Sequence, residues 1–287
     1  MAEIMPHREN SPAQMAAIRS RILDVLSQLP WDGFRYQHSI PGLSLYCLVE
    51  PAGPFSSVYE PSLSLIIKGS KRISVGDETI VYDESSFFLT AIGLPLTGQI
   101  CTASTAEPYV AATLRLDLER LRRLIADHDI PPPAAPERDL GIAVGSATPD
   151  LVDAFFRLIS LAKTPADISF MASHIQNEIL YRLLSGELGG RLRRFALAGS
   201  NSHRVAKAVA WLKENYTLPL RLEELAGMAN MGVSTLHHHF RAMTAMSPLQ
   251  FQKHLRLHHA RELMLAGSID AATAALRVGY ESPTQFN

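Results

Sequence analysis

The sequence predicts an α+β protein in which a barrel of short strands, with flanking helices, is followed by an all-α domain with two helix-turn-helix motifs. Three observations predict this architecture. Apolar residues recur in short, closely spaced runs between residues 43 and 116, as they do in strands. From residue 150 onward they recur every three or four residues, which is the period of a helix. In the last quarter of the chain, a short helix, a tight turn and a second helix occur twice.

The front of the chain begins with a helical pattern over residues 14–29 and then becomes strand-like. Gly76 and Asp77 separate two apolar runs and predict a hairpin with a two-residue turn. At least six short strands with turn signals between them favour a barrel or a sandwich. The expected strands lie within residues 43–50, 63–67, 73–75, 79–82, 86–89 and 109–116.

A small barrel without catalytic groups can enclose one small ligand, and we expect such an effector between residues 30 and 120. If the apolar residues that alternate over 43–49 face inward, Cys47 faces inward too. Two interpretations of Cys47 and Cys101 stay open: an inert thiol packed as a small apolar group, or a thiol that reacts with an electrophile or oxidant. The candidate effector-binding residues are Leu45, Cys47, Tyr59 and Leu65.

An alternative function for the barrel is metal-dependent catalysis, with the helical tail as a scaffold. Enzymes built on such barrels hold the metal with a His-x-His pair, a nearby glutamate and a later histidine. His38 is the only histidine between residues 30 and 120. The three adjacent histidines at 237–239 would point about 100° apart on a helix and cannot converge on one ion. We therefore expect no metal, no cofactor, no catalytic residue and no enzymatic activity.

The first helix-turn-helix pattern spans residues 222–243. Its first helix carries an apolar stripe formed by Leu222, Leu225, Ala226 and Ala229. After the interruption at residues 230–232, a second helix turns Leu236, Phe240 and Met243 inward. Small polar and basic side chains on its exposed face suit the major groove of DNA. The outward residues are Ser234, Thr235, His237, His238 and Arg241.

The second pattern begins with Asp270 as the N-cap of a short helix that Gly279 ends. Ser282, followed by Pro283, Thr284 and Gln285, then forms a capping-box signature. These residues open a second reading helix, which Asn287 cuts after about one and a half turns. We therefore expect the chain to be a fragment.

One amphipathic helix joins the two patterns. It opens with the start signal Ser247-Pro248-Leu249-Gln250 and runs to Met264. About eighteen residues at roughly 1.5 Å each make a rod about 27 Å long. Major grooves on one side of B-DNA recur about every 34 Å, so one chain can present two reading helices to successive grooves.

Several strings in this region fit the pattern of one family. They are Leu225-Ala226, Leu236 to Phe240, Ser247-Pro248, Arg256-Leu257 with Ala260 and Leu263-Met264, and Val278-Gly279-Tyr280 with Ser282 and Phe286. On these strings, residues 203–287 resemble the DNA-binding domain of the AraC/XylS-type bacterial transcription regulators. The resemblance implies base contacts from Ser234, Thr235, His237 and His238, and in the second motif from Pro283, Thr284 and Gln285. Gly232 departs from the usual serine or threonine before the first reading helix and is a weaker cap.

The string from Tyr59 to Gly69, together with residues 75–78, resembles the cupin-like sensor domain of one branch of the same family. Two helical patterns over 150–163 and 167–187 follow it. We expect these helices to cover the open end of the barrel and, as the resemblance implies, to form a homodimer. The predicted domains are 1–188 for sensing and dimerisation, 189–201 as a linker, and 202–287 for DNA binding.

Charge supports this division, because residues 200–287 carry nine Lys or Arg against six Asp or Glu, within a chain of net charge −1. The sequence lacks an export signal and a run of eighteen apolar residues, and two cysteines form no disulfide framework. We predict a cytoplasmic, sequence-specific transcription regulator that does not contact membranes. Its expected partners are double-stranded promoter DNA and a small-molecule effector, with RNA polymerase as a further candidate.

Overall fold

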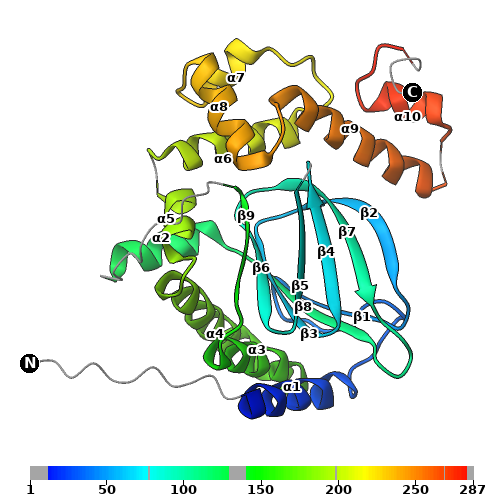
Figure 1. Ribbon diagram of the computed structural model, residues 1–287, viewed down its shortest axis with the longest axis vertical. Helices are drawn as coiled ribbons and strands as arrows, with labels where there is room; N and C mark the ends of the chain where they lie inside the picture. Colours follow the sequence, from blue (N-terminus) through cyan, green and yellow to red (C-terminus); the bar gives the residue numbers. More distant parts are fainter. Residues whose placement is uncertain (1–11, 77, 129–139, 198, 268, 283–287) are drawn as a thin grey trace, which may run out of the picture.

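The computed structural model describes residues 12–76, 78–128, 140–197, 199–267 and 269–282. Two antiparallel sheets form the front of the molecule, and the helical part from α6 to α10 lies at one end of them, opposite α1 (Figure 1). One sheet contains, in spatial order, β1 (Leu43–Leu48), β8 (Tyr109–Arg115), β3 (Ser62–Lys68), β6 (Ser86–Thr90) and β9 (Ile142–Ser146). The other contains β2 (Ala52–Tyr59), β7 (Leu94–Thr102), β4 (Ser70–Val75) and β5 (Glu78–Asp83).

The six strands expected from the sequence are present, and β2, β7 and β9 were missed. Pro54 and Gly53 in β2, and Pro95 and Gly98 in β7, resemble turn signals in the sequence, although both residue types occur in strands at irregular or edge positions. The hairpin between β4 and β5 was predicted correctly, since Val75 pairs with Glu78.

The five-stranded sheet is covered on both faces, so six of the seven residues of β3 are buried. Its outer face packs against α1 (Pro12–Leu26), α3 (Pro149–Ser160) and α4 (Pro165–Ser185). The residues that the strands contribute to this core include Leu43, Leu45, Cys47, Leu63 and Leu65. The expectation that this half of the β1 alternation faces the barrel interior was therefore wrong. Alternation indicates that a strand has two faces, but it does not say which neighbour covers each face.

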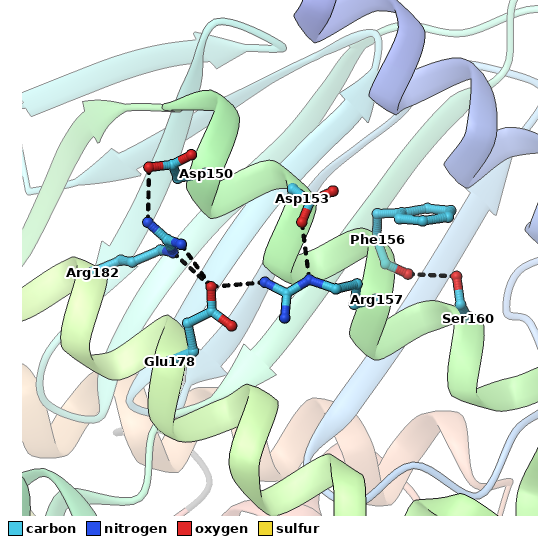
Figure 2. A network of polar contacts seen from close by, with 7 residues as sticks. All are labelled: Asp150, Asp153, Phe156, Arg157, Ser160, Glu178 and Arg182. Atoms are coloured by element: carbon cyan, nitrogen blue, oxygen red, sulfur yellow. Dashed lines mark hydrogen bonds and ion pairs between the residues drawn. The ribbon is translucent and has the colours of Figure 1, made fainter. Parts of the chain in front are cut away.

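Helices α3 and α4 have the predicted bounds to within a few residues, but they cover the outer face of this sheet rather than an open end of the barrel. A network of charged side chains joins them (Figure 2). Arg157 donates to Asp153 and Glu178, and Arg182 donates to Glu178 and Asp150, with distances of 2.7–2.9 Å. Burial raises the pKa of Glu178, but the hydrogen bonds and charges of the two arginines outweigh it, and the pKa is lowered.

The segment expected as a linker contains a helix, α5 (Gly189–Ala196). Gly189 is required there for close packing, since a Cβ atom would lie 1.9 Å from the Leu184 carbonyl oxygen. Arg191 is buried and donates from Nη1 to the Ile142 carbonyl at 2.7 Å. Residues 189–196 are therefore ordered rather than a flexible connection, while the domain boundaries themselves stay predictions. Helix α2 (Leu118–Asp127) follows β8, packs on the same core as α3 and α4, and contacts α4 and α5.

The described C-terminal residues fold into five helices that the sequence predicts, whereas the predicted second reading helix lies outside the described residues. Their bounds are α6 (Asn201–Glu214), α7 (Leu222–Met228), α8 (Val233–Thr244), α9 (Pro248–Leu265) and α10 (Ala271–Arg277). The capping box of Ser247 and Gln250 at α9 is formed, and Asp270 caps α10 by accepting from the Thr273 N–H.

These helices dock on the sheets through a shared apolar core. Phe240 and Leu212 belong to the same buried cluster as Ile66 and Phe88 of the five-stranded sheet. The Gly141 N–H also donates to the Met243 carbonyl at 2.7 Å. Helix α8 and the strands therefore form one packed unit.

Candidate functional site

Helix α8 forms the first candidate site because it is buried on one side only. Leu236, Phe240 and Met243 are at most 1 % exposed, and the ring of Phe240 packs edge-on against Phe251 at 5.5 Å. The opposite face is open to solvent. A shallow depression on it is lined by Val233, Ser234, His237, His238, Arg241 and Ala242. Thr235 is also exposed, so all five predicted residues of this helix lie on the surface.

The turn before α8 sets its orientation. Asn230 adopts a left-handed conformation with φ of 50°, and the Met231 N–H donates to the Ala226 carbonyl at 2.9 Å. Ala226 is buried, as the close crossing of two helices requires. Gly232 caps α8 without a side-chain hydrogen bond. Backbone N–H groups at such a helix start are suited to phosphate oxygens.

The second motif is anchored through α9 and α10. Arg256 on α9 donates to the carbonyls of Tyr216, Thr217 and Leu218 at 2.7–3.2 Å, and its guanidinium lies over the ring of Tyr280. Gly279 has φ of 94°, and a Cβ atom there would lie 2.1 Å from the Thr217 carbonyl oxygen. The predicted site residues Pro283, Thr284 and Gln285 lie outside the described residues.

A cavity of about 510 Å³ between the two sheets forms the second candidate site. Of the four residues predicted to bind an effector, only Tyr59 lines it. Leu45, Cys47 and Leu65 belong to the core between sheet and helices. The lining includes the other half of the β1 alternation, Ser44, Tyr46 and Leu48. Its polar and aromatic composition was the signal that sequence reasoning missed, since ligand cavities combine apolar walls with a few polar groups.

The charged groups of the cavity wall are Glu60, Lys71 and Arg115. Glu60 pairs with Lys213 of α6, with distances of 2.5 and 2.6 Å from Nζ to the two carboxylate oxygens. The stem of Lys213 crosses Gly93, where a Cβ atom would lie 2.8 Å from Lys213 Cδ. One ion pair thus connects the cavity wall with the helical domain.

Burial determines the protonation of the remaining groups in the cavity. It lowers the pKa of the Lys71 ammonium to about 8. It also raises the pKa of Tyr59, Tyr82 and Tyr109 above the usual value, so these phenols are neutral near pH 7. The cavity therefore combines phenol hydroxyls with a lysine that is cationic at neutral pH.

Comparisons with known proteins agree with this arrangement. Residues 39–191 match the family model described as AraC-type transcriptional regulator N-terminus, and residues 225–287 match a helix-turn-helix domain. The chain belongs to the AraC-type transcriptional regulators. This confirms the family resemblance found in the sequence, and both sheet and helical parts have the expected order.

Sequence relatives match parts of this AraC-type chain. The transcriptional activator RhaS of Klebsiella pneumoniae (strain 342) is 26% identical over 99 residues, which are 33% of this chain and 36% of RhaS. RhaS of Salmonella schwarzengrund (strain CVM19633) is 25% identical over 134 residues, or 46% and 47% of the two chains. The matched region thus spans less than half the length of these relatives.

Solved structures resemble the chain over most of its length. Apo ToxT of Vibrio cholerae strain SCE256, in a single-residue variant, has a TM-score of 0.57 at 10% identity, covering 87% of this chain and 93% of ToxT. Wild-type ToxT with a bound unsaturated fatty acid has a TM-score of 0.53 at 12% identity, covering 85% and 88%. At this identity the likeness concerns the fold.

Other features of the AraC-type chain bear on the alternatives left open by the sequence. The family comprises transcription regulators. Within the described residues, no group of three His, Cys, Asp or Glu side chains is placed to hold a metal ion. Cys47 is buried and Cys101 half-buried, and both are free thiols. In the same residues, no helix combines the length and apolar character needed to cross a membrane.

Proposed function

We propose that the chain binds promoter DNA in a sequence-specific manner and that a small molecule in the cavity between the sheets controls this binding. One observation carries the proposal: the exposed polar face of α8 belongs to a helix whose buried face shares a core with the strands that enclose the cavity. A ligand can act by favouring one arrangement of these packed parts over another.

We assign base contacts in the major groove to Ser234, Thr235, His237 and His238, because these side chains are exposed on one face of α8. Arg241 and the start of α8 are assigned to phosphates. Pro283, Thr284 and Gln285 are proposed as the corresponding contacts of the second motif. The rod α9 supports this division, because it separates two motifs by a distance suited to successive grooves.

We also propose that the chain forms a homodimer through α3 and α4. Phe170 is 67 % exposed and Tyr181 51 % exposed. They lie three helical turns apart on one face of α4, with the exposed Met171 beside them. Exposed apolar residues grouped on one face mark interaction sites. Contact with RNA polymerase and a cytoplasmic location complete the proposal, supported by the activator relatives and by the need to reach promoter DNA.

Selection of binding sites from a random DNA pool by the purified chain tests the proposal. We expect enrichment of a defined motif, and two half-motifs about one helical turn apart if both reading helices act. A variant pair sharpens the test: His238→Ala changes the enriched motif, whereas His128→Ala, an exposed histidine at the end of α2, does not. Recovery of random sequences by the wild-type chain would contradict sequence-specific binding.

A further inference from the structure

Three side chains converge above Gly98 in the wall of the cavity. Gly98 lies on β7, between β2 with Phe55 and Tyr59 and β4 with Lys71. A Cβ atom at Gly98 would lie 2.5 Å from Tyr59 Oη, 3.0 Å from Phe55 Cε2 and 3.3 Å from Lys71 Cε. The missing side chain therefore provides the space in which a phenol, an aromatic ring and an ammonium group meet.

The ammonium group of Lys71 contacts aromatic rings but no counter-charge. Lys71 Nζ lies 5.1 Å from the ring centre of Tyr59 and 5.7 Å from that of Phe55. In the part of the chain that the structure describes, neither Lys71 Nζ nor Tyr59 Oη forms a hydrogen bond or an ion pair, although both side chains line the cavity. An ammonium group removed from water without a counter-charge is unfavourable, so the cavity is electrostatically incomplete.

The acidic group of the cavity wall does not supply the missing charge. Glu60 is engaged by Lys213 through both carboxylate oxygens. Arg115, at the end of β8, adds a second positive charge to the lining. The cavity is therefore cationic and complementary to an anion.

The remaining wall is suited to an apolar body. Aromatic rings contribute much of the lining, which includes Phe34, Tyr46, Phe55, Tyr59, Tyr82 and Tyr109. About 510 Å³ is enough for a small organic molecule. One ammonium and one phenol hydroxyl can each donate to one of the two oxygens of a carboxylate.

We infer that the effector of this chain is a small carboxylate with an apolar body, and that Lys71 Nζ and Tyr59 Oη above Gly98 hold its two oxygens. This inference rests on the proposed effector control and specifies its ligand class. The body of the ligand packs against the aromatic rings, and charge on the effector, rather than shape alone, decides which molecules bind.

Matched pairs of acids and alcohols test the inference on the full chain by isothermal titration calorimetry. The probes are benzoate, trans-cinnamate, 2-naphthoate and octanoate, each compared with its primary alcohol. We expect at least one acid to bind the wild-type chain about tenfold more tightly than its alcohol. Lys71→Met removes this preference and leaves alcohol binding within about twofold, while Lys71→Arg restores part of it.

A control variant and two further variants locate the anchor. Lys68→Met breaks a surface ion pair with Glu107 outside the cavity lining and keeps the preference. Tyr59→Phe lowers acid affinity about threefold, and Gly98→Ala lowers it more, because its methyl group occupies the position next to Tyr59 Oη. These two variants keep the inference testable if Lys71→Met does not fold.

Several outcomes would overturn the inference. The chain could bind acids and alcohols with equal affinity, or bind none of the probes. The preference for an acid over its alcohol could also survive Lys71→Met, or be removed by Arg115→Met instead. DNA affinity of the wild-type chain, measured with and without a bound acid, separates the two proposals. If acids bind but leave DNA affinity unchanged, the carboxylate site is supported and control of DNA binding by an effector is contradicted. If only neutral compounds bind in the cavity and change DNA affinity, effector control is supported and the carboxylate site is contradicted.

Discussion

Helix α8 is covered on one side only, whereas strand β1 is covered on both. The uncovered face of α8 carries the proposed DNA-contacting residues on the surface of the molecule, where no packing restricts which side chains they are. The second face of β1 lines an internal cavity, where Ser44 and Tyr46 are half-buried. A surface site can therefore change without loss of stability, while a cavity site is part of the packing that holds the sheets together.

Truncation of the α8 core should produce the largest effect on stability. Phe240 is fully buried against Phe251, and Phe240→Ala is expected to lower the free energy of unfolding by about 3–5 kcal/mol. Tyr46→Ala on β1 removes a half-buried ring beside an existing cavity and should cost about 1 kcal/mol. Urea unfolding of the full chain measures both; equal losses would show that the cavity wall is packed as tightly as the α8 core.

Substitutions on the exposed face of α8 should change DNA binding and leave stability almost unchanged. His238→Ala is expected to reduce discrimination at one base position by about 1–3 kcal/mol. Arg241→Ala should weaken binding to all sequences and reduce the dependence of affinity on salt by about one phosphate contact. Fluorescence anisotropy with the selected site and single-base variants measures both effects. Loss of thermal stability in either variant would contradict the separation of site and core.

Acid binding in the cavity should depend on pH through Lys71. Its pKa is about 8 in the free chain, and a bound carboxylate raises it, so the complex retains the proton that the free chain loses. Affinity is then highest below pH 8 and falls above it by up to tenfold per pH unit. Calorimetry between pH 6.5 and 9.5 measures the fall, and Lys71→Arg should flatten it because its guanidinium stays charged.

The other ionisable groups that line the cavity could also influence the pH dependence of acid binding. Burial raises the pKa of Tyr59, Tyr82 and Tyr109, so they keep their protons above pH 8. The remaining ionisable lining residues are Tyr46, Glu60, which pairs with Lys213, and Arg115. An affinity that rises with pH would be inconsistent with a lysine anchor.

The ion pair between the two regions should contribute least to stability. Lys213 and Glu60 are partly exposed, so Lys213→Met should change the free energy of unfolding by less than about 1 kcal/mol. Because this pair connects the cavity wall to α6, the variant should nevertheless reduce the effect of a bound acid on DNA affinity. Lys207→Met, an exposed lysine on the same helix, is the control. Equal behaviour of the two variants would exclude the pair as a connection.

The sequence by itself determined the order of the parts, the first helix-turn-helix motif, the first helix of the second motif and the outward residues of α8. It could do so because a helix with one buried face shows that face directly in its period, as Leu236, Phe240 and Met243 do. The start signals at Ser247 and Asp270 are local, since a cap bonds to the backbone within three residues.

Only the tertiary structure decided which half of the β1 alternation faces the cavity, that residues 189–196 form a packed helix, and that Lys71 and Tyr59 meet above Gly98. These features depend on contacts between residues far apart in the chain. The alternation of β1 separates an apolar half from a more polar and aromatic half, but which layer each half meets depends on the packing of the sheet against the helices and the second sheet. Glycines such as Gly98 and Gly189 resemble turn signals locally, but their role is to allow close approach of distant atoms.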